Sequence, residues 1–124
     1  MKTPHKRLKN EWLMVAATVV MMILSHFSPA VAEINLEREQ AARYDLNYAS
    51  YLIEVGKYME ALENYETALE LTSRTQTKID ALLAKATLLS TFLDAPEEAL
   101  KVYREVYRQY PQAAEIARYR EGLL

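Results

Sequence analysis

One stretch of this 124-residue chain constrains the fold more than any other, because it joins a turn residue to a helix with fixed small and aromatic positions. The turn residue is Gly56, and a run without Gly or Pro follows it to about Leu71. Within this run Ala61, Tyr65 and Ala68 stand four and then three residues apart, which places them on one face of a helix. Small residues on that face let another helix approach closely, so the stretch predicts one half of a tightly packed helix pair.

The same pattern occurs a second time, 38 residues further along the chain. Ala99, Tyr103 and Val106 take the three positions, and Pro111 ends the run. The sequence has no alternating run bounded by turn residues, which a strand would need. We therefore predict an all-α fold, in which antiparallel helix pairs form a short α-solenoid with a C-terminal capping helix.

The two stretches together resemble the tetratricopeptide repeat (TPR), a helix–turn–helix unit of about 34 residues. The repeat-defining residues are Ala49, Gly56, Tyr58, Ala61, Tyr65, Ala68, Ala99, Tyr103, Val106 and Pro111. The resemblance covers roughly residues 42–111 and implies a TPR-like solenoid.

The chain departs from the family pattern in three places. Asp45 stands where a large apolar residue is usual, and Asp94 replaces the turn glycine of the second unit. The step between the units is four residues longer than the usual period, and we place the excess in a longer polar connector at residues 72–77.

Capping residues and breakers give the expected boundaries. We expect helix pairs at about 36–71 and 76–109 and a cap at 112–123, within a domain of residues 33–124. Asn35 is expected to cap the first helix and Asp94 the fourth.

Residues 1–32 have a different character from the rest of the chain. They carry a net charge of +3, whereas the remainder carries −5. An uncharged apolar run begins at Trp12, and Ala30-Val31-Ala32 follows Pro29. A basic start, an apolar core and an A-x-A site predict a secretory signal peptide that is cleaved after Ala32.

The alternative is an uncleaved N-terminal anchor. No formal charge occurs from Trp12 to Ala32, and about 20 apolar residues are enough to span a bilayer. Under either interpretation the basic end stays inside, so the domain is exported to a periplasmic or other extracytoplasmic location.

The residue types exclude several kinds of chemistry. The chain has no Cys, and its two His residues, His5 and His26, both precede the expected domain. Imidazole-activated nucleophiles, thiol catalysis and ordinary zinc sites are therefore not expected there, and no glycine-rich phosphate loop occurs. We predict that the protein is not an enzyme and uses no cofactor or metal. The acidic domain also argues against a nucleic-acid partner.

The nine tyrosines all follow Glu33. Those that the repeat does not constrain are Tyr44, Tyr51, Tyr107, Tyr110 and Tyr119. For these, core packing and contact with a partner both remain open, because Tyr is common at binding hot spots.

The TPR resemblance also implies a concave groove, lined by the first helix of each pair, that receives a peptide or helix of a protein partner. The groove positions of this chain are Arg43, Leu46, Ser50, Ile53, Ala84, Leu88, Thr91 and Arg118. They are mostly small and apolar, so we expect a partner segment with apolar anchors.

This leads to two functional hypotheses. The first is a non-catalytic protein–protein interaction module, an adaptor, scaffold or assembly factor of the cell envelope. The alternative is a structural, self-associating helical protein, a homo-oligomer anchored to the membrane by its N-terminal segment. A membrane contact is expected only if that segment is uncleaved.

Overall fold

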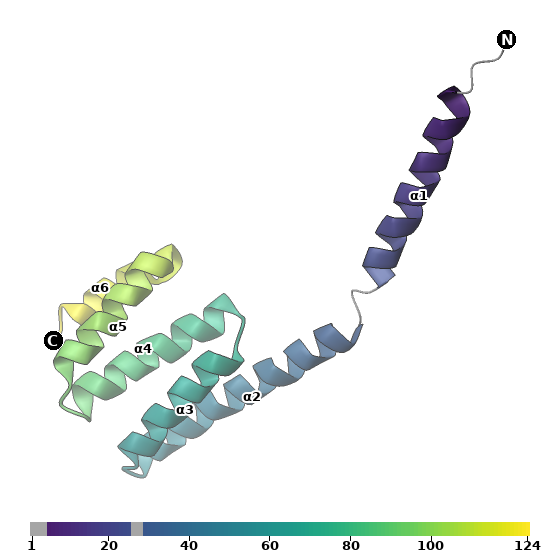
Figure 1. Cartoon of the computed structure of the whole chain (residues 1–124). Coiled ribbons are helices and arrows are strands. Elements are labelled where there is room, and N and C mark those ends of the chain that lie inside the picture. The colour runs from purple at the N-terminus through teal and green to yellow at the C-terminus, as the bar shows by residue number, and fades with distance from the viewer. Residues whose placement is uncertain (1–4, 26–28) are drawn as a thin grey trace. The chain divides into compact units, whose positions relative to one another are not determined.

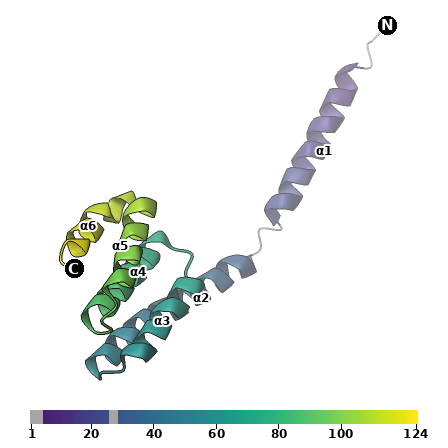
Figure 2. The ribbon, with the colours of Figure 1, turned by 60° about the vertical axis from the view of Figure 1, so that its left-hand side comes forward.

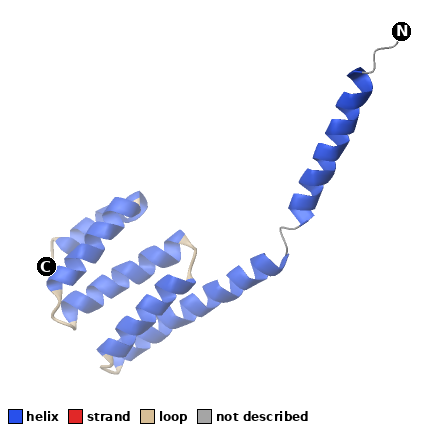
Figure 3. Cartoon of the chain, viewed as in Figure 1, coloured by secondary structure: helices blue, strands red, loops and turns tan. Residues whose placement is uncertain are grey.

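The structure is a computed structural model that describes residues 5–25 and 29–124. The chain divides into two compact units, Met1–Ile34 and Asn35–Leu124. Lys2, which belongs to the basic start, and His26 both lie outside the described residues. Every described element is a helix (Figure 3).

The first unit contains α1 (His5–Ser25) and the beginning of α2 (Pro29–Glu54). The described side chains of α1, from Asn10 to Met22, are all exposed. Within the two described ranges, no helix is both long and apolar enough to cross a membrane.

The second unit contains the rest of α2, followed by five further helical elements. These are α3 (Tyr58–Leu71), α4 (Thr75–Thr91), α5 (Pro96–Gln109), the 3₁₀ helix η1 (Pro111–Ala113) and α6 (Ala114–Glu121). Helix α4 packs on α3, α5 on α4 and α6 on α5, so these four helices succeed one another as layers (Figures 1 and 2).

Helix α4 is the shared centre of two hydrophobic clusters. Leu88 belongs to the cluster that α2 and α3 supply, with Leu52 and Tyr65. Other α4 side chains, including Leu82 and Leu89, belong to the cluster formed with α5 and α6. An apolar helix surface that faces both neighbours ties the two halves of the domain together.

The repeat-defining residues lie where close packing requires them. Ala49, Ala61, Tyr65, Ala68, Ala99, Tyr103 and Val106 are all buried. Tyr58 is half-buried and stacks on Phe92, with the ring centroids 4.9 Å apart. Pro111 begins η1, and Tyr110 separates it from the end of α5.

The turn between α2 and α3 has Gly56 just past the end of α2, as expected. Gly56 has φ = 79°, a left-handed conformation that a residue without Cβ adopts at little cost. The amide of Lys57 donates to Leu52 O at 2.8 Å, and that of Gly56 donates to Ile53 O at 3.0 Å. These two bonds form the Schellman pattern that satisfies the last carbonyls of α2.

The turn between α4 and α5 corrects one prediction. Asp94 does not cap α5, because the residue before that helix is Ala95 and no side chain bonds to the helix start. Instead Asp94 has φ = 50°, the left-handed position that Gly56 takes in the first pair. Asp and Asn tolerate this conformation better than most residues with a side chain.

Two helix starts also differ from the predictions. Helix α2 begins at Pro29, so Asn35 lies inside it and is not a cap. Pro is well suited to the first turn of a helix, and no helix breaker stands between it and Asn35. Helix α4 begins at Thr75, so the connector is only residues 72–74, and the extra residues lengthen α4.

Asp45, which stands where the repeat usually has a large apolar residue, is half-buried on α2. Burial raises the pKa of its carboxyl group, because the charged form loses contact with water.

Candidate functional site

A hollow of about 290 Å³ lies between α2 and the start of α4. It is lined by Arg43, Leu46, Asn47, Gln76, Thr77 and Asp80. We call it the first hollow. Two of its residues, Arg43 and Leu46, belong to the groove predicted from the sequence.

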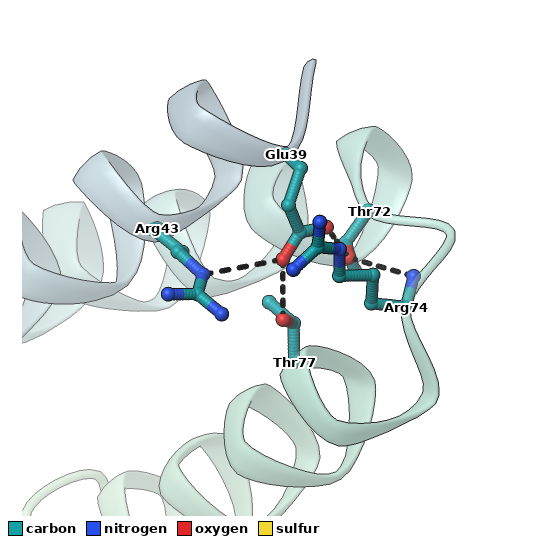
Figure 4. Close-up of polar contacts among 5 residues, drawn as sticks. All are labelled: Glu39, Arg43, Thr72, Arg74 and Thr77. Carbon is teal, nitrogen blue, oxygen red and sulfur yellow. Dashed lines mark hydrogen bonds and ion pairs between the residues drawn. The ribbon is translucent and has the colours of Figure 1, made fainter. Parts of the chain in front are cut away.

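A buried carboxylate stands behind this hollow. The side chain of Glu39, on α2, is only 4% exposed. It accepts hydrogen bonds from Thr72 Oγ1 and Thr77 Oγ1, each at 2.5 Å, and one from Arg43 Nε at 3.4 Å. Figure 4 shows these donors around the carboxylate, with Arg74 beside them.

The surroundings of Glu39 favour its ionised form. Burial by itself would raise the pKa of the carboxyl group. The hydrogen bonds from Thr72, Thr77 and Arg43, together with the charge of Arg74, outweigh burial and hold this pKa below its ordinary value. Glu39 is therefore a carboxylate at neutral pH, with its acceptors satisfied from several sides.

This network positions part of the first hollow. Thr77 and Arg43 both line the hollow, and Glu39 binds both side chains. Thr72 is fixed in turn, because its Oγ1 also accepts the amide of Arg74 at 3.1 Å. The wall of the hollow is thus held from behind by a charge-assisted network, which reduces the freedom of its polar groups.

Several polar groups at the first hollow have hydrogen-bonding capacity left. Gln76 Nε2 donates to Asp80 Oδ1 at 2.8 Å, and the amide oxygen of Gln76 accepts no hydrogen bond from the part of the chain that the structure describes. Among the described residues, the side chain of Asn47 has no hydrogen-bond partner. Arg43 has donors beyond its Nε, so donors and acceptors both face the hollow.

A second hollow, of about 530 Å³, lies further along α4 toward the C-terminal end of the chain. It is lined by Thr87, Ser90, Thr91, Asp94, Pro96, Tyr103, Arg120, Leu123 and Leu124. Thr91 belongs to the predicted groove.

Arg120 ties α6 to α4 at this second hollow. Its Nη1 donates to Thr87 Oγ1 at 3.2 Å and to Leu83 O at 3.5 Å. Because the Thr87 hydroxyl donates to the same Leu83 carbonyl at 2.9 Å, the Tyr103 hydroxyl is the donor in its 3.3 Å contact with Thr87. The remaining guanidinium nitrogens of Arg120 form no hydrogen bond within the described part of the chain.

The other predicted groove residues do not form one continuous surface. Ile53 and Ala84 are half-buried beside the core cluster, and Ser50 is exposed, with its hydroxyl donating to Leu46 O at 3.2 Å. Arg118 lies on α6, with its guanidinium 5.2 Å from the centre of the Tyr107 ring.

The placement of Leu88 in the groove is wrong. Its side chain is 1% exposed and packs against α2 and α3, so a partner in solution does not reach it. The hollows instead take Asp80 and Thr87 from α4, each one position before a buried residue, Ala81 or Leu88. Of the predicted α4 positions, Thr91 lines a hollow, whereas Leu88 is replaced there by its neighbour Thr87.

Sequence reasoning missed Glu39, Asn47, Gln76, Thr77 and Asp80. One signal was available for the first, because Glu39, Arg43 and Leu46 follow one another at helical spacing on one face of α2. The expected connector at residues 72–77 included Gln76 and Thr77, so neither was considered as a site residue.

In residues 5–25 and 29–124, no three or more His, Cys, Asp or Glu side chains gather where they could hold a metal ion. Comparison with protein-family models, with curated proteins and with solved structures finds no match for this chain.

Proposed function

We propose that this chain is a two-repeat, TPR-like interaction module that holds an extended segment of another protein along α4. The observation that carries the proposal is the first hollow, whose wall combines free donors on Arg43 and Asn47 with free acceptors on Gln76 and Asp80. An extended peptide backbone presents donors and acceptors in alternation, so a wall of both kinds suits it.

The polar character of the hollow changes the kind of segment expected. The sequence suggested apolar anchors, but Leu88 is in the core and Leu46 is the one apolar side chain that lines the first hollow. Recognition therefore relies on hydrogen bonds to the backbone of the bound segment, with Leu46 as a small apolar contact. Such a groove accepts different sequences more readily than an apolar pocket does.

The location and the class of the protein are part of the same proposal. The basic start, the apolar run and Ala30-Val31-Ala32 support export, with the domain acting as an adaptor or assembly factor of the envelope. N-terminal sequencing of the native protein separates a chain that begins at Glu33 from one that keeps Met1 as an anchor.

Site-specific photo-crosslinking tests the binding surface. A photoreactive phenylalanine analogue is placed at Asn47 or Thr91, at the two hollows, and at Thr67 or Lys101, which are exposed positions of α3 and α5. All four positions are outside the core, so the fold is preserved. In cells that make the protein, we expect adducts with one partner from the hollow positions and none from the other two.

A filling variant checks the same surface. Asn47→Trp should abolish that adduct when the probe is at Thr91, whereas Thr67→Trp should leave it unchanged. Adducts that form only from Thr67 and Lys101 would move the binding surface to the other face of the helix pairs, and no adduct from any position would contradict the proposal.

A further inference from the structure

Four exposed side chains form a stripe along α2. Tyr44, Tyr48, Tyr51 and Val55 follow one another at steps of four, three and four residues, so they share one face of the helix. Their exposed fractions are 66%, 39%, 53% and 48%. We call these four residues the tyrosine stripe.

The tyrosine rings are ordered before any partner binds. The centroids of Tyr44 and Tyr48 are 6.0 Å apart, with an interplanar angle of 12°, and those of Tyr48 and Tyr51 are also 6.0 Å apart, at 24°. Stacked rings have already lost much of their rotational freedom, so covering them costs less entropy. Tyrosine also supplies large contact area with a polar edge, which is typical of interface anchors.

The charges beside the stripe are arranged symmetrically about its middle. Arg43 precedes Tyr48 by five residues and Glu54 follows it by six, and at 3.6 residues per turn both lie on the same side of the stripe. Arg43 is 61% exposed and uses only Nε on Glu39. Glu54 is exposed and forms no ion pair within the described residues.

We propose that the tyrosine stripe is the contact surface for a second copy of this chain, with the two α2 helices antiparallel about a two-fold axis near Tyr48. A two-fold axis there brings Arg43 of each copy beside Glu54 of the other. It also places Tyr48 against its own counterpart and Tyr44 against Tyr51 of the other copy. An interface of this kind is isologous, and its charges are complementary only in the antiparallel orientation.

The ends of the stripe fit the same arrangement. Glu37 lies on this face about three turns before Tyr48. Lys57 follows the C-terminal end of α2 and lies close enough to Tyr48 and Tyr51 to interact with them electrostatically. Antiparallel pairing therefore brings Glu37 of one copy toward Lys57 of the other, whose Nζ also pairs with Glu60 of its own chain at 3.0 Å.

Disulfide mapping in the full-length chain tests this register, because the protein has no native cysteine. Under mild oxidation, Tyr48→Cys should form a disulfide-linked dimer with itself. Tyr44→Cys should form none alone, since its two copies lie about 12 Å apart along the helix axes, and a disulfide requires Cα atoms within about 7 Å. Mixing Tyr44→Cys with Tyr51→Cys should give the cross-linked pair.

Exchanging the charges of Arg43 and Glu54 provides an independent test of the antiparallel register. In a Tyr48→Cys background, Glu54→Arg or Arg43→Glu alone should reduce the linked dimer at least several-fold, because like charges then meet across the axis. Mixing the two variants should restore it, since each copy then faces an opposite charge. Circular dichroism checks the fold of Arg43→Glu, whose new carboxylate lies beside Glu39; if that variant unfolds, the cysteine map decides alone.

The results separate the possible occupants of the stripe. Efficient linkage through Tyr44→Cys alone, or through the exposed α3 control Glu63→Cys, would overturn the proposed register. A Tyr48→Cys chain that stays monomeric would overturn the proposal, whether its thiol is freely alkylated or is protected by another partner. The proposal shares Arg43 with the first hollow, but the cysteine map leaves Arg43 unchanged, so a monomeric Tyr48→Cys chain leaves the proposed peptide groove standing.

Discussion

At the scale of single residues, Glu39 is the side chain on which the first hollow most depends. It joins α2 to the connector and to α4 through two threonine hydroxyls. A buried carboxylate without such donors would be strongly unfavourable, so the network and the burial require each other. Glu39 also binds the first turn of α4, because that turn supplies Thr77.

We expect Glu39→Gln to lower the free energy of unfolding at pH 7 by about 1–3 kcal/mol, because hydrogen bonds to a charged group are lost and one amide proton faces a hydroxyl donor. The pKa of Glu39 is lowered in the folded state, so its contribution is fully present above its ordinary pKa of 4.5 and disappears as the pH falls through the folded value. The difference between the two proteins should therefore shrink below about pH 4.5.

Urea unfolding of both proteins at a series of pH values measures this difference. Glu63→Gln, an exposed change on α3, is the matched control and should follow the parent at every pH. A difference between Glu39→Gln and the parent that is equally large at neutral and at strongly acidic pH would show that the charge of Glu39 is not what stabilises the domain.

Glu39 could not be assigned from the sequence, although its helix could. Its two threonine partners are 33 and 38 residues away, and neither lies at a spacing that predicts contact. Its signal in the sequence was the pairing with Arg43 one turn later, which is common on exposed helix surfaces and indicates little by itself.

At the scale of elements, the two turns between paired helices each contain one left-handed residue, although their backbone hydrogen bonds differ. Gly56 and Asp94 both have positive φ. A Cβ added at Gly56 would meet no atom within 4 Å, so space is not the reason for glycine at this position. The requirement at Gly56 is conformational, so a substitution there measures the cost of a left-handed residue without steric effects.

We expect Gly56→Ala to destabilise the domain by about 1 kcal/mol, the lower part of the range for a left-handed residue with Cβ. Asp94→Ala should also destabilise it, because Asp tolerates this conformation better than Ala. Asp94→Gly should be neutral or slightly stabilising. Thermal melts of the three variants give the comparison, and a stabilising effect of both alanines would contradict the left-handed assignment.

Helix bounds were predictable where a breaker marks them and not where packing decides. Helix α3 has the expected bounds, Tyr58–Leu71, because Gly56 separates it from α2. The connector was expected at residues 72–77 and the next helix from about residue 76, because hydroxyl residues favour helix caps over helix interiors. The stretch from Thr75 to Thr77 is helical because Thr77 and Ile79 are buried, and tertiary packing outweighs such weak preferences.

At the scale of the whole molecule, α4 links both cores. The repeat pattern predicted which small and aromatic residues of α3 and α5 would be buried. It did not predict that Leu88 would be buried, because that depends on how Leu88 packs against α2 and α3. The groove assignments were consequently closer to the observed hollows on α2 than on α4.

This arrangement predicts that the domain unfolds as one cooperative unit. Ala61 and Ala99 are both fully buried, one in each cluster, and neither site has room for an indole. Ala61→Trp and Ala99→Trp should each lower the free energy of unfolding by about 1–3 kcal/mol or more through overpacking. Because α4 contributes to both clusters, damage to either should move a single transition.

Differential scanning calorimetry and circular dichroism of the two variants measure this coupling. Lys101→Trp, at an exposed position of α5, is the control for the added indole and should melt like the parent. If Ala61→Trp instead produced two separate transitions, with α5 and α6 melting at the parental temperature, α4 would not couple the two halves. If neither buried variant lowered the melting temperature, the close helix pairing at these alanines would be contradicted as well.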